Sequence, residues 1–372
     1  MSLVLNGTTG ITNLPSINSG QIGGRRNIVI NGEMKVAQRA TSATGKTGGT
    51  SGYFALDRWK LQDGTIGTAG RCTIAQIADG PAGFANCLKI SATTADTSID
   101  AREALILQTR FEGQDLQQLK KGTSSAEQVT VSFYVKGNAA ALYVCELHDV
   151  DNGRNNTQSF AVTTDWNRIE LTFAADTSDP LDDDNAVSLS LNFWLHSGSN
   201  YSGGTFASNT WADITLANTT AVANRTSIYD STNRTFFLTG VQMEIGSTAT
   251  DFEHRSFCEE YDLCKRYYYQ SYDLGVAAGT TSNAGAIMLY AITGNTFRYN
   301  IYFSPSMRAS PTMTFYNVED GTAGEMNREG AGGTSPEALA VVFNSPKRAM
   351  LYNTDIGIAG NYYFHYTASA EL

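Results

Sequence analysis

The longest alternating stretch of the sequence reads Val187-Ser188-Leu189-Ser190-Leu191-Asn192-Phe193-Trp194-Leu195-His196. Apolar residues take the odd positions, and the even positions carry polar residues and Trp194. A repeat of two places successive side chains on opposite faces of an extended chain. The stretch therefore predicts a half-buried strand, with one face in a core and the other towards solvent.

Shorter stretches of the same kind lie on both sides of it. Val129, Val131, Phe133 and Val135 alternate with polar residues and Tyr134, and Ile169, Leu171 and Phe173 alternate with Arg168, Glu170 and Thr172. Turn signals such as 151–153 (Asp-Asn-Gly) and 202–204 (Ser-Gly-Gly) separate such runs. Short alternating strands between turns are typical of an antiparallel β-sandwich.

One segment has a helical pattern instead. Ser256 and Glu259 form a capping-box pattern, and Phe257, Tyr261, Cys264 and Tyr268 follow at helical spacing. We expect a linking helix over 256–268. Alternation resumes beyond it, as in Tyr362, Phe364 and Tyr366, which predicts a second, smaller β-sandwich-like domain.

These patterns divide the chain into four parts. Residues 1–25 are rich in Gly, Asn and Ser and are expected to be an arm for attachment or trimer assembly. The large β-domain takes 26–255, the linking helix 256–268 and the smaller β-domain 269–372. The predicted fold class is all-β.

Composition narrows the possible partners. The 372 residues carry a net charge of −10, and only 17% of them are charged, against roughly 25% in an average soluble domain. Nucleic acids and anionic membranes require clustered positive charge, so neither is an expected partner. No secretory signal or apolar run long enough to span a bilayer is present in the sequence. The five cysteines form no C-x-x-C pair, and we expect free, mostly buried thiols.

Motifs for catalysis are weak. Residues 40–47 loosely match a phosphate loop, but the glycine-rich 48–52 cannot begin the helix that such a loop requires. Residues 149–153 resemble the start of a calcium loop, yet the twelfth position is Phe160 rather than a carboxylate. No G-x-S-x-G elbow is present. The sequence therefore predicts a protein that is not an enzyme and that uses no cofactor or metal, although residues distant in sequence can still meet in space.

Aromatic side chains are the more promising signal for binding. Trp194 falls on the polar face of its strand beside Asn192, where an indole could stack on a sugar ring and an amide could bind hydroxyls. Tyr201 and Trp211 flank the loop that follows. We predict glycan binding by Trp194, Asn192, Tyr201 and Trp211. The alternative is that Trp194 is covered by that loop or by a neighbouring subunit.

Two blocks of sequence resemble those of phage tail-fibre and other virion appendage proteins. The first is 26–39 (RNIVINGEMKVAQR) with 53–59 (YFALDRW), and the second is 240–246 (GVQMEIG) with 252–257 (FEHRSF) and 264–268 (CKRYY). The start, 1–10 (MSLVLNGTTG), is similar to structural proteins of marine cyanophages. Residues 133–137 (FYVKG) and 164–168 (TDWNR) are similar to carbohydrate-binding modules of jelly-roll type. The resemblance covers residues 26–268.

The resemblance implies a jelly-roll domain in a homotrimeric, non-enzymatic fibre of the virion, made in the host cytoplasm. Its partners would be copies of itself, other virion proteins through the arm, and a host cell-surface glycan. Some related modules hold a structural calcium, for which Glu33 and Glu244 would be the nearest acidic residues. A structural head fibre or tail adaptor and a depolymerase tailspike are the alternatives.

Overall fold

The computed structural model describes residues 16–17, 20–21, 25–64, 67–292, 297–329, 337–353 and 356–372. All pairings between their strands are antiparallel. The all-β prediction is confirmed. The predicted arm 1–25 lies outside the described residues, apart from Arg25 and the paired strands β1 (Ser16–Ile17) and β2 (Gly20–Gln21).

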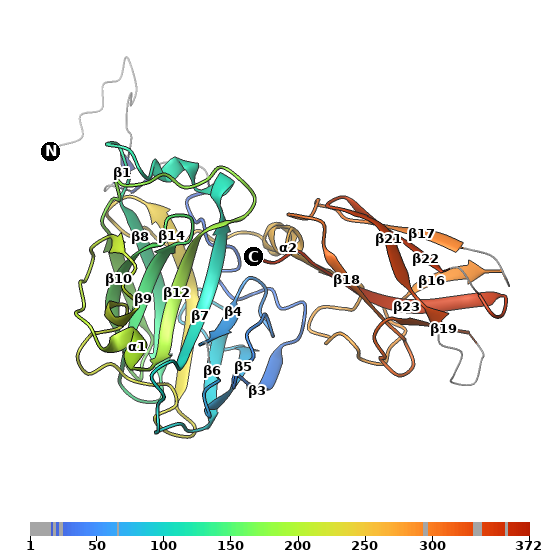
Figure 1. The fold of residues 1–372 in the computed structure, drawn as a ribbon, viewed down its shortest axis with the longest axis horizontal. Coiled ribbons are helices and arrows are strands. Elements are labelled where there is room, and N and C mark those ends of the chain that lie inside the picture. Colours follow the sequence, from blue (N-terminus) through green and yellow to red (C-terminus); the bar gives the residue numbers. More distant parts are fainter. Residues whose placement is uncertain are drawn as a thin grey trace, which may run out of the picture.

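The N-terminal domain is a sandwich of two six-stranded sheets (Figure 1). The first, called here the cleft sheet, has the order β13 (Ala212–Asp213), β10 (Arg154–Val162), β9 (Ala141–Asp149), β12 (Val187–Ser197), β7 (Ala104–Glu112), β4 (Lys60–Asp63). The second, called the back sheet, has the order β11 (Asn167–Phe173), β8 (Val129–Gly137), β14 (Thr235–Ile245), β6 (Cys87–Thr94), β5 (Arg71–Ile77), β3 (Ser42–Lys46).

The core of this domain lies between the two sheets, where the alternating residues meet as predicted. The apolar face of β12, Leu189 to Leu195, is fully or almost fully buried there with Phe133 of β8. Aromatic rings hold the two layers together: Phe133 meets Phe193 edge to face at 5.0 Å between centroids. Ser190, Asn192 and Trp194 therefore lie on the outer face of the cleft sheet, whereas a second register shift between Trp194 and His196 pairs His196 with the core residue Leu105.

Val187 departs from the predicted alternation. The pairing of β12 with β7 shifts register between Val187 and Leu189, a bulge that places Val187 against Glu112. Val187 consequently lines a pocket on the outer face and does not join the core. An alternating pattern cannot reveal a bulge, because the extra residue is set by the neighbouring strand.

Helix α2 (Phe257–Lys265) links the two domains (Figure 1). The predicted cap is present: the Ser256 hydroxyl accepts a hydrogen bond from the Glu259 amide at 3.2 Å. The helix is shorter than the predicted 256–268, because Tyr268 begins strand β15 (Tyr268–Gln270) and pairs with Ser369. The other helical segments are single turns: α1 (Ser199–Ser202), η1 (Gly113–Asp115), η2 (Gln117–Leu119) and η3 (Leu216–Asn218).

The C-terminal domain has its own core between two sheets. In the larger sheet β23 (Gly360–Ser369) is central and pairs with β15, β16 (Ile287–Ala291), β18 (Thr312–Tyr316) and β19 (Glu325–Arg328), which in turn pairs with β20 (Glu337–Ala338). The smaller sheet has the order β17 (Phe297–Tyr302), β22 (Arg348–Asn353), β21 (Ala340–Ser345). Phe315, Phe364 and Leu351 are among the residues buried between them.

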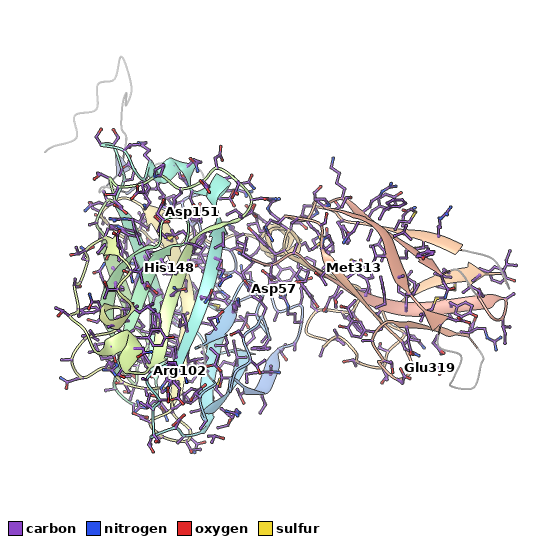
Figure 2. All side chains as sticks on the ribbon, viewed as in Figure 1. Asp57, Arg102, His148, Asp151, Met313 and Glu319 are labelled. Carbon is purple, nitrogen blue, oxygen red and sulfur yellow. The ribbon has the colours of Figure 1, made fainter. Side chains whose placement is uncertain are left out.

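Buried charges join the two domains near Asp57 (Figure 2). The Glu371 carboxylate forms ion pairs with Arg58 and, at 2.9 Å, with Arg39. The guanidinium of Arg58 also stacks on the ring of Tyr267, 3.5 Å from its centroid. Because these side chains are almost fully buried, the domain junction depends on their mutual neutralisation.

The two blocks that carry the sequence resemblance lie side by side. Asn27 donates through its side-chain amide to the Val241 carbonyl at 3.1 Å and accepts from the Met243 amide at 3.1 Å. Asn31 donates its backbone N–H to Glu260 of α2 at 2.5 Å. Hydrogen bonds of Asn27 and Asn31 of the first block therefore connect the beginning of the N-terminal domain to its last strand and to α2.

The cysteines agree with the expectation of free, mostly buried thiols. All five cysteines are free, and all except Cys258 are buried. In the described part of the chain, no helix has the length and apolar character required to cross a membrane.

Candidate functional site

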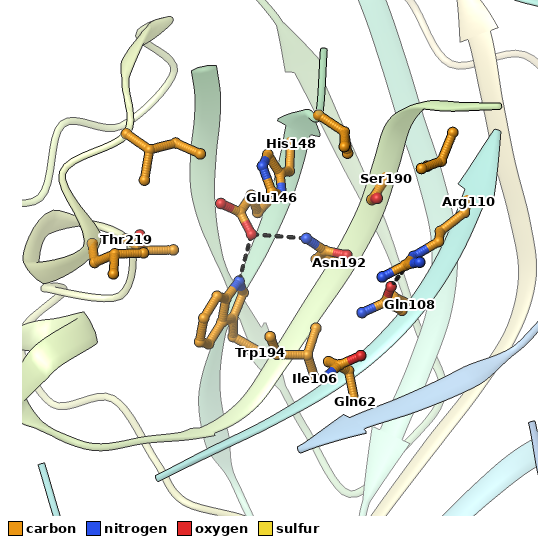
Figure 3. Close-up of a pocket in the computed structure, with 14 residues that line it drawn as sticks. Gln62, Ile106, Gln108, Arg110, Glu146, His148, Ser190, Asn192, Trp194 and Thr219 are labelled. Carbon is orange, nitrogen blue, oxygen red and sulfur yellow. Dashed lines mark hydrogen bonds between the residues drawn. The ribbon is translucent and has the colours of Figure 1, made fainter. Parts of the chain in front are cut away.

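A pocket of about 290 Å³ opens on the outer face of the cleft sheet (Figure 3). Its floor is formed by side chains that face outward from β9, β12, β7 and β4, and one wall comes from the loop after β13. The lining residues are Gln62, Ile106, Gln108, Arg110, Glu146, His148, Val150, Val187, Ser190, Asn192, Trp194, Ile214, Leu216 and Thr219.

Strand register sets the order of the polar groups on the floor. Asn192 of β12 stands directly opposite Glu146 of β9 on one side and Gln108 of β7 on the other. In the next row, Ser190 stands between His148 and Arg110. Directly paired residues of an antiparallel sheet point to the same face, so these groups form two adjacent polar rows.

Glu146 is the most constrained group of the pocket. Its Oε2 accepts hydrogen bonds from Asn192 Nδ2 at 2.9 Å and from Trp194 Nε1 at 2.7 Å, as dashed lines show in Figure 3. Its Oε1 accepts from Asn155 Nδ2 at 2.8 Å. Glu146 is buried, and no cation lies within ion-pair distance of it among the described residues. Three neutral donors therefore stabilise its carboxylate.

Two polar atoms of the lining lack partners. The side-chain Oδ1 of Asn192 and Oγ1 of Thr219 accept no hydrogen bond in the described part of the protein, although these residues are only 4% and 2% exposed. The amide of Asn192 cannot turn without losing its bond to Glu146. Buried polar groups are nearly always satisfied, so a pocket lined by two unsatisfied acceptors is suited to a ligand that donates hydrogen bonds.

Trp194 forms one side of the pocket and is 8% exposed. It packs with Ile106 and Val144 beneath the loop that follows β12, and the ring of Tyr201 in α1 lies 5.2 Å from its own ring. Of the alternatives left open by the sequence, the covering loop is present. The indole can therefore offer an edge to a ligand in the pocket, but not an open stacking surface.

The four predicted glycan-binding residues are brought together only in part. Asn192 and Trp194 line the pocket, whereas Tyr201 packs against Trp194 and is not one of the lining residues. Trp211 packs against the sandwich core, and its Nε1 donates to the Ala174 carbonyl at 2.7 Å. The structure thus places Tyr201 and Trp211 outside the pocket, while glycan binding by the four residues stays a prediction.

Sequence reasoning missed most of the polar lining, including Gln108, Arg110, Glu146 and His148. A signal was available, because Ile106, Gln108 and Arg110 alternate with the buried Leu105 and Leu107 on β7. Alternation identifies outward-facing residues, but it does not identify which outward faces are adjacent. That information lies in the strand order.

One cluster resembles catalytic machinery. Nδ1 of His196 lies 2.7 Å from Ser227 Oγ, and its Nε2 lies 3.4 Å from Glu103 Oε2. The imidazole is fully buried, and burial lowers the pKa of His196 to about 4. Neither Ser227 nor His196 lines the pocket on the cleft sheet. Ser227 Oγ also accepts a hydrogen bond from the backbone N–H of Tyr229 at 2.9 Å, so the geometry is that of a structural hydrogen-bond network.

The acidic residues considered for a structural calcium already have protein partners. Glu33 pairs with Lys35 at 2.7 Å and with His254 at 2.8 Å. Glu244 accepts from the amide and hydroxyl of Thr250 at 2.8 and 2.7 Å. Within the described ranges, no group of three or more His, Cys, Asp or Glu side chains could hold a metal ion.

No family model and no curated protein matches the sequence. Among solved structures, the chain is similar to the family 11 carbohydrate-binding module of a cellulosomal cellulase from Clostridium thermocellum, with 13% identity, TM-score 0.28, and coverage of 57% of this chain and 100% of that one. The chain is also similar to a family 30 carbohydrate-binding module, with 12% identity, TM-score 0.28, and coverage of 61% of this chain and 95% of that one. A third similar structure is the enzymatically active domain of bacteriophage CBA120 tailspike protein 4, with 13% identity, TM-score 0.27, and coverage of 50% of this chain and 19% of that one. These weak similarities do not identify a ligand.

Proposed function

We propose that this chain binds a glycan, without cleaving it, in the pocket on the cleft sheet. The observation that carries the proposal is the row Glu146, Asn192, Gln108, which lies on three neighbouring strands and lines one cavity with carboxylate and amide groups. Sugar hydroxyls both donate and accept hydrogen bonds, so they complement such a row.

The unpartnered acceptors support the same ligand. Asn192 Oδ1 and Thr219 Oγ1 are each able to accept a hydrogen bond from a hydroxyl. Trp194, held in place by Glu146, provides an apolar edge for the C–H groups of a sugar ring. An apolar ligand would leave both acceptors as they are among the described residues of the free protein, without a partner.

Binding by the full chain to a glycan array tests the proposal. Asn192→Ala should abolish binding, because it removes an acceptor and one donor to Glu146. Asn200→Ala is the matched control, since Asn200 is an exposed asparagine of α1 outside the pocket. Retention of full binding by a folded Asn192→Ala protein would show that the pocket is not the glycan site.

We further propose that the chain is a homotrimeric phage virion fibre that attaches to the host through this glycan. The support is the sequence resemblance of residues 26–268, together with apolar side chains left exposed on the C-terminal domain. Met288 and Tyr290 of β16 are 56% and 65% exposed. Self-association would cover such side chains, and three weak sites on one trimer would bind a cell surface by avidity.

Light scattering on the purified chain separates this proposal from its alternatives. A stable trimer that binds glycan supports the fibre. A trimer without glycan binding favours a structural head fibre or tail adaptor, and a monomer opposes both. Release of new reducing ends from host polysaccharide would favour a depolymerase tailspike instead.

A further inference from the structure

Arg110 is a cation of the pocket without a counter-ion. Its Nε donates to Gln108 Oε1 at 2.6 Å, which holds the plane of the guanidinium. The two Nη nitrogens have no hydrogen-bond acceptor and no carboxylate partner in the described part of the protein. Arg110 therefore presents free donors in the fixed fork geometry that suits carboxylate and sulfate oxygens.

Lys60 adds a second cation to the same side. It stands opposite Gln108 on β4, so both side chains face outward from the sheet, and it forms no ion pair among the described residues. Arg110 follows Gln108 by two residues on β7, so Lys60 and Arg110 are diagonal neighbours on the same face of the sheet. Burial, and then repulsion from Arg110, lower the pKa of Lys60. Glu371 also acts on Lys60, but that carboxylate is already paired with Arg39 and Arg58. Positive charge thus collects here in a chain whose net charge is −10.

The anion of the pocket lies on the opposite side. Glu146 is on β9 and Arg110 on β7, with β12 between them (Figure 3). Two strand spacings separate these backbones by about 10 Å, a width comparable to a sugar ring with its substituents. Glu146 favours hydroxyls and repels anions at one end of the pocket, while Arg110 attracts anions at the other.

We infer that the pocket selects glycans bearing an anionic substituent, a carboxylate or a sulfate, and that Arg110 binds this group while Glu146 and Asn192 bind hydroxyls of the same sugar. The inference rests on the proposed glycan binding. It makes Arg110 a specificity-determining residue, because a neutral sugar would leave its two Nη groups without an ionic partner.

The experiment uses two matched pairs of probes with the full chain. Polygalacturonate is compared with its methyl-esterified form, and κ-carrageenan with its desulfated form, so that only the charge differs within each pair. Affinity electrophoresis should show at least about tenfold tighter binding to the charged member of one pair than to its uncharged member. The pair that shows this preference identifies the bound group as a carboxylate or a sulfate. Arg110→Gln should reduce this affinity to that of the uncharged member.

Arg102→Gln is the control, because it removes the same charge from an exposed arginine outside the pocket. It should leave both affinities unchanged. Equal affinity for charged and uncharged members, or undiminished preference in Arg110→Gln, would overturn the inference. If the protein then binds the uncharged probes and Asn192→Ala abolishes that binding, the proposed glycan binding is supported without the preference for anionic glycans. Failure of the folded protein to bind any of the four probes would count against both.

Discussion

The indole N–H of Trp194 donates a 2.7 Å hydrogen bond to Oε2 of Glu146, and both residues are buried at the edge of the pocket. Trp194 comes from β12 and Glu146 from β9, so the bond crosses between neighbouring strands. Tyr201 packs on the indole beneath the covering loop. One side of the pocket is therefore built in advance of any ligand, which lowers the entropy cost of binding.

Glu146→Ala should destabilise the N-terminal domain. The change leaves the buried donors of Asn192 and Trp194 and the half-buried donor of Asn155 without their acceptor, and we expect a loss of about 2–3 kcal/mol in the free energy of unfolding. Urea unfolding followed by tryptophan fluorescence measures it. Glu170→Ala, at an exposed ion pair with Arg168, should change stability by less than about 1 kcal/mol. Equal effects of the two changes would contradict this account of Glu146.

Trp194→Phe tests the role of the indole N–H separately from that of the aromatic ring. The phenyl ring keeps an apolar edge but cannot donate to Glu146, so glycan affinity should fall by about 1 kcal/mol, or roughly fivefold. Trp194→Ala also removes the packing with Ile106 and Val144 and should weaken binding more strongly. Isothermal titration calorimetry with a glycan identified on the array gives both affinities. Unchanged affinity in Trp194→Ala would exclude Trp194 from the site.

His196 should make stability depend on pH. Burial holds its pKa at about 4, below the 6.5 of the free side chain, so the unfolded chain binds more protons between these values. Neutral His196 makes its full contribution to the free energy of unfolding above pH 6.5. This contribution decreases as the pH falls towards 4, by about 3 kcal/mol in total. His196→Gln lacks this titration, so the stability difference between wild type and variant should shrink as the pH falls. Urea unfolding at pH 7 and pH 4.5 measures it, and a constant difference would contradict the shifted pKa.

Glu371→Gln should weaken the junction between the domains. Arg39 keeps Asp57 as a partner at 3.2 Å, but Arg58 loses its carboxylate while its side chain is only 1% exposed. Removing one member of a buried ion pair costs about 3–5 kcal/mol. Glu127→Gln, at the exposed pair with Lys120, is the matched control and should have a small effect. Calorimetry and limited proteolysis at α2 provide the readout, and equal melting of the two variants would contradict a stabilising role for Glu371.

The sequence by itself determined the strands and the beginning of the helix, because these depend on neighbours in the chain. Leu189 to Leu195 reach the core as the period of two requires, and Ser256 caps α2 as its hydroxyl allows. The outward position of Asn192 and Trp194 follows from the same pattern.

Only the tertiary structure decided what those outward residues meet. Glu146, Asn192 and Gln108 become neighbours through pairings between β9, β12 and β7, which no local pattern encodes. The pairing of β12 with β7 also moves Val187 out of the core. Other long-range contacts end α2 at Lys265 and cover Trp194 with the loop carrying Tyr201. Side-chain alternation is a property of one strand, whereas a binding site depends on the order and register of several strands.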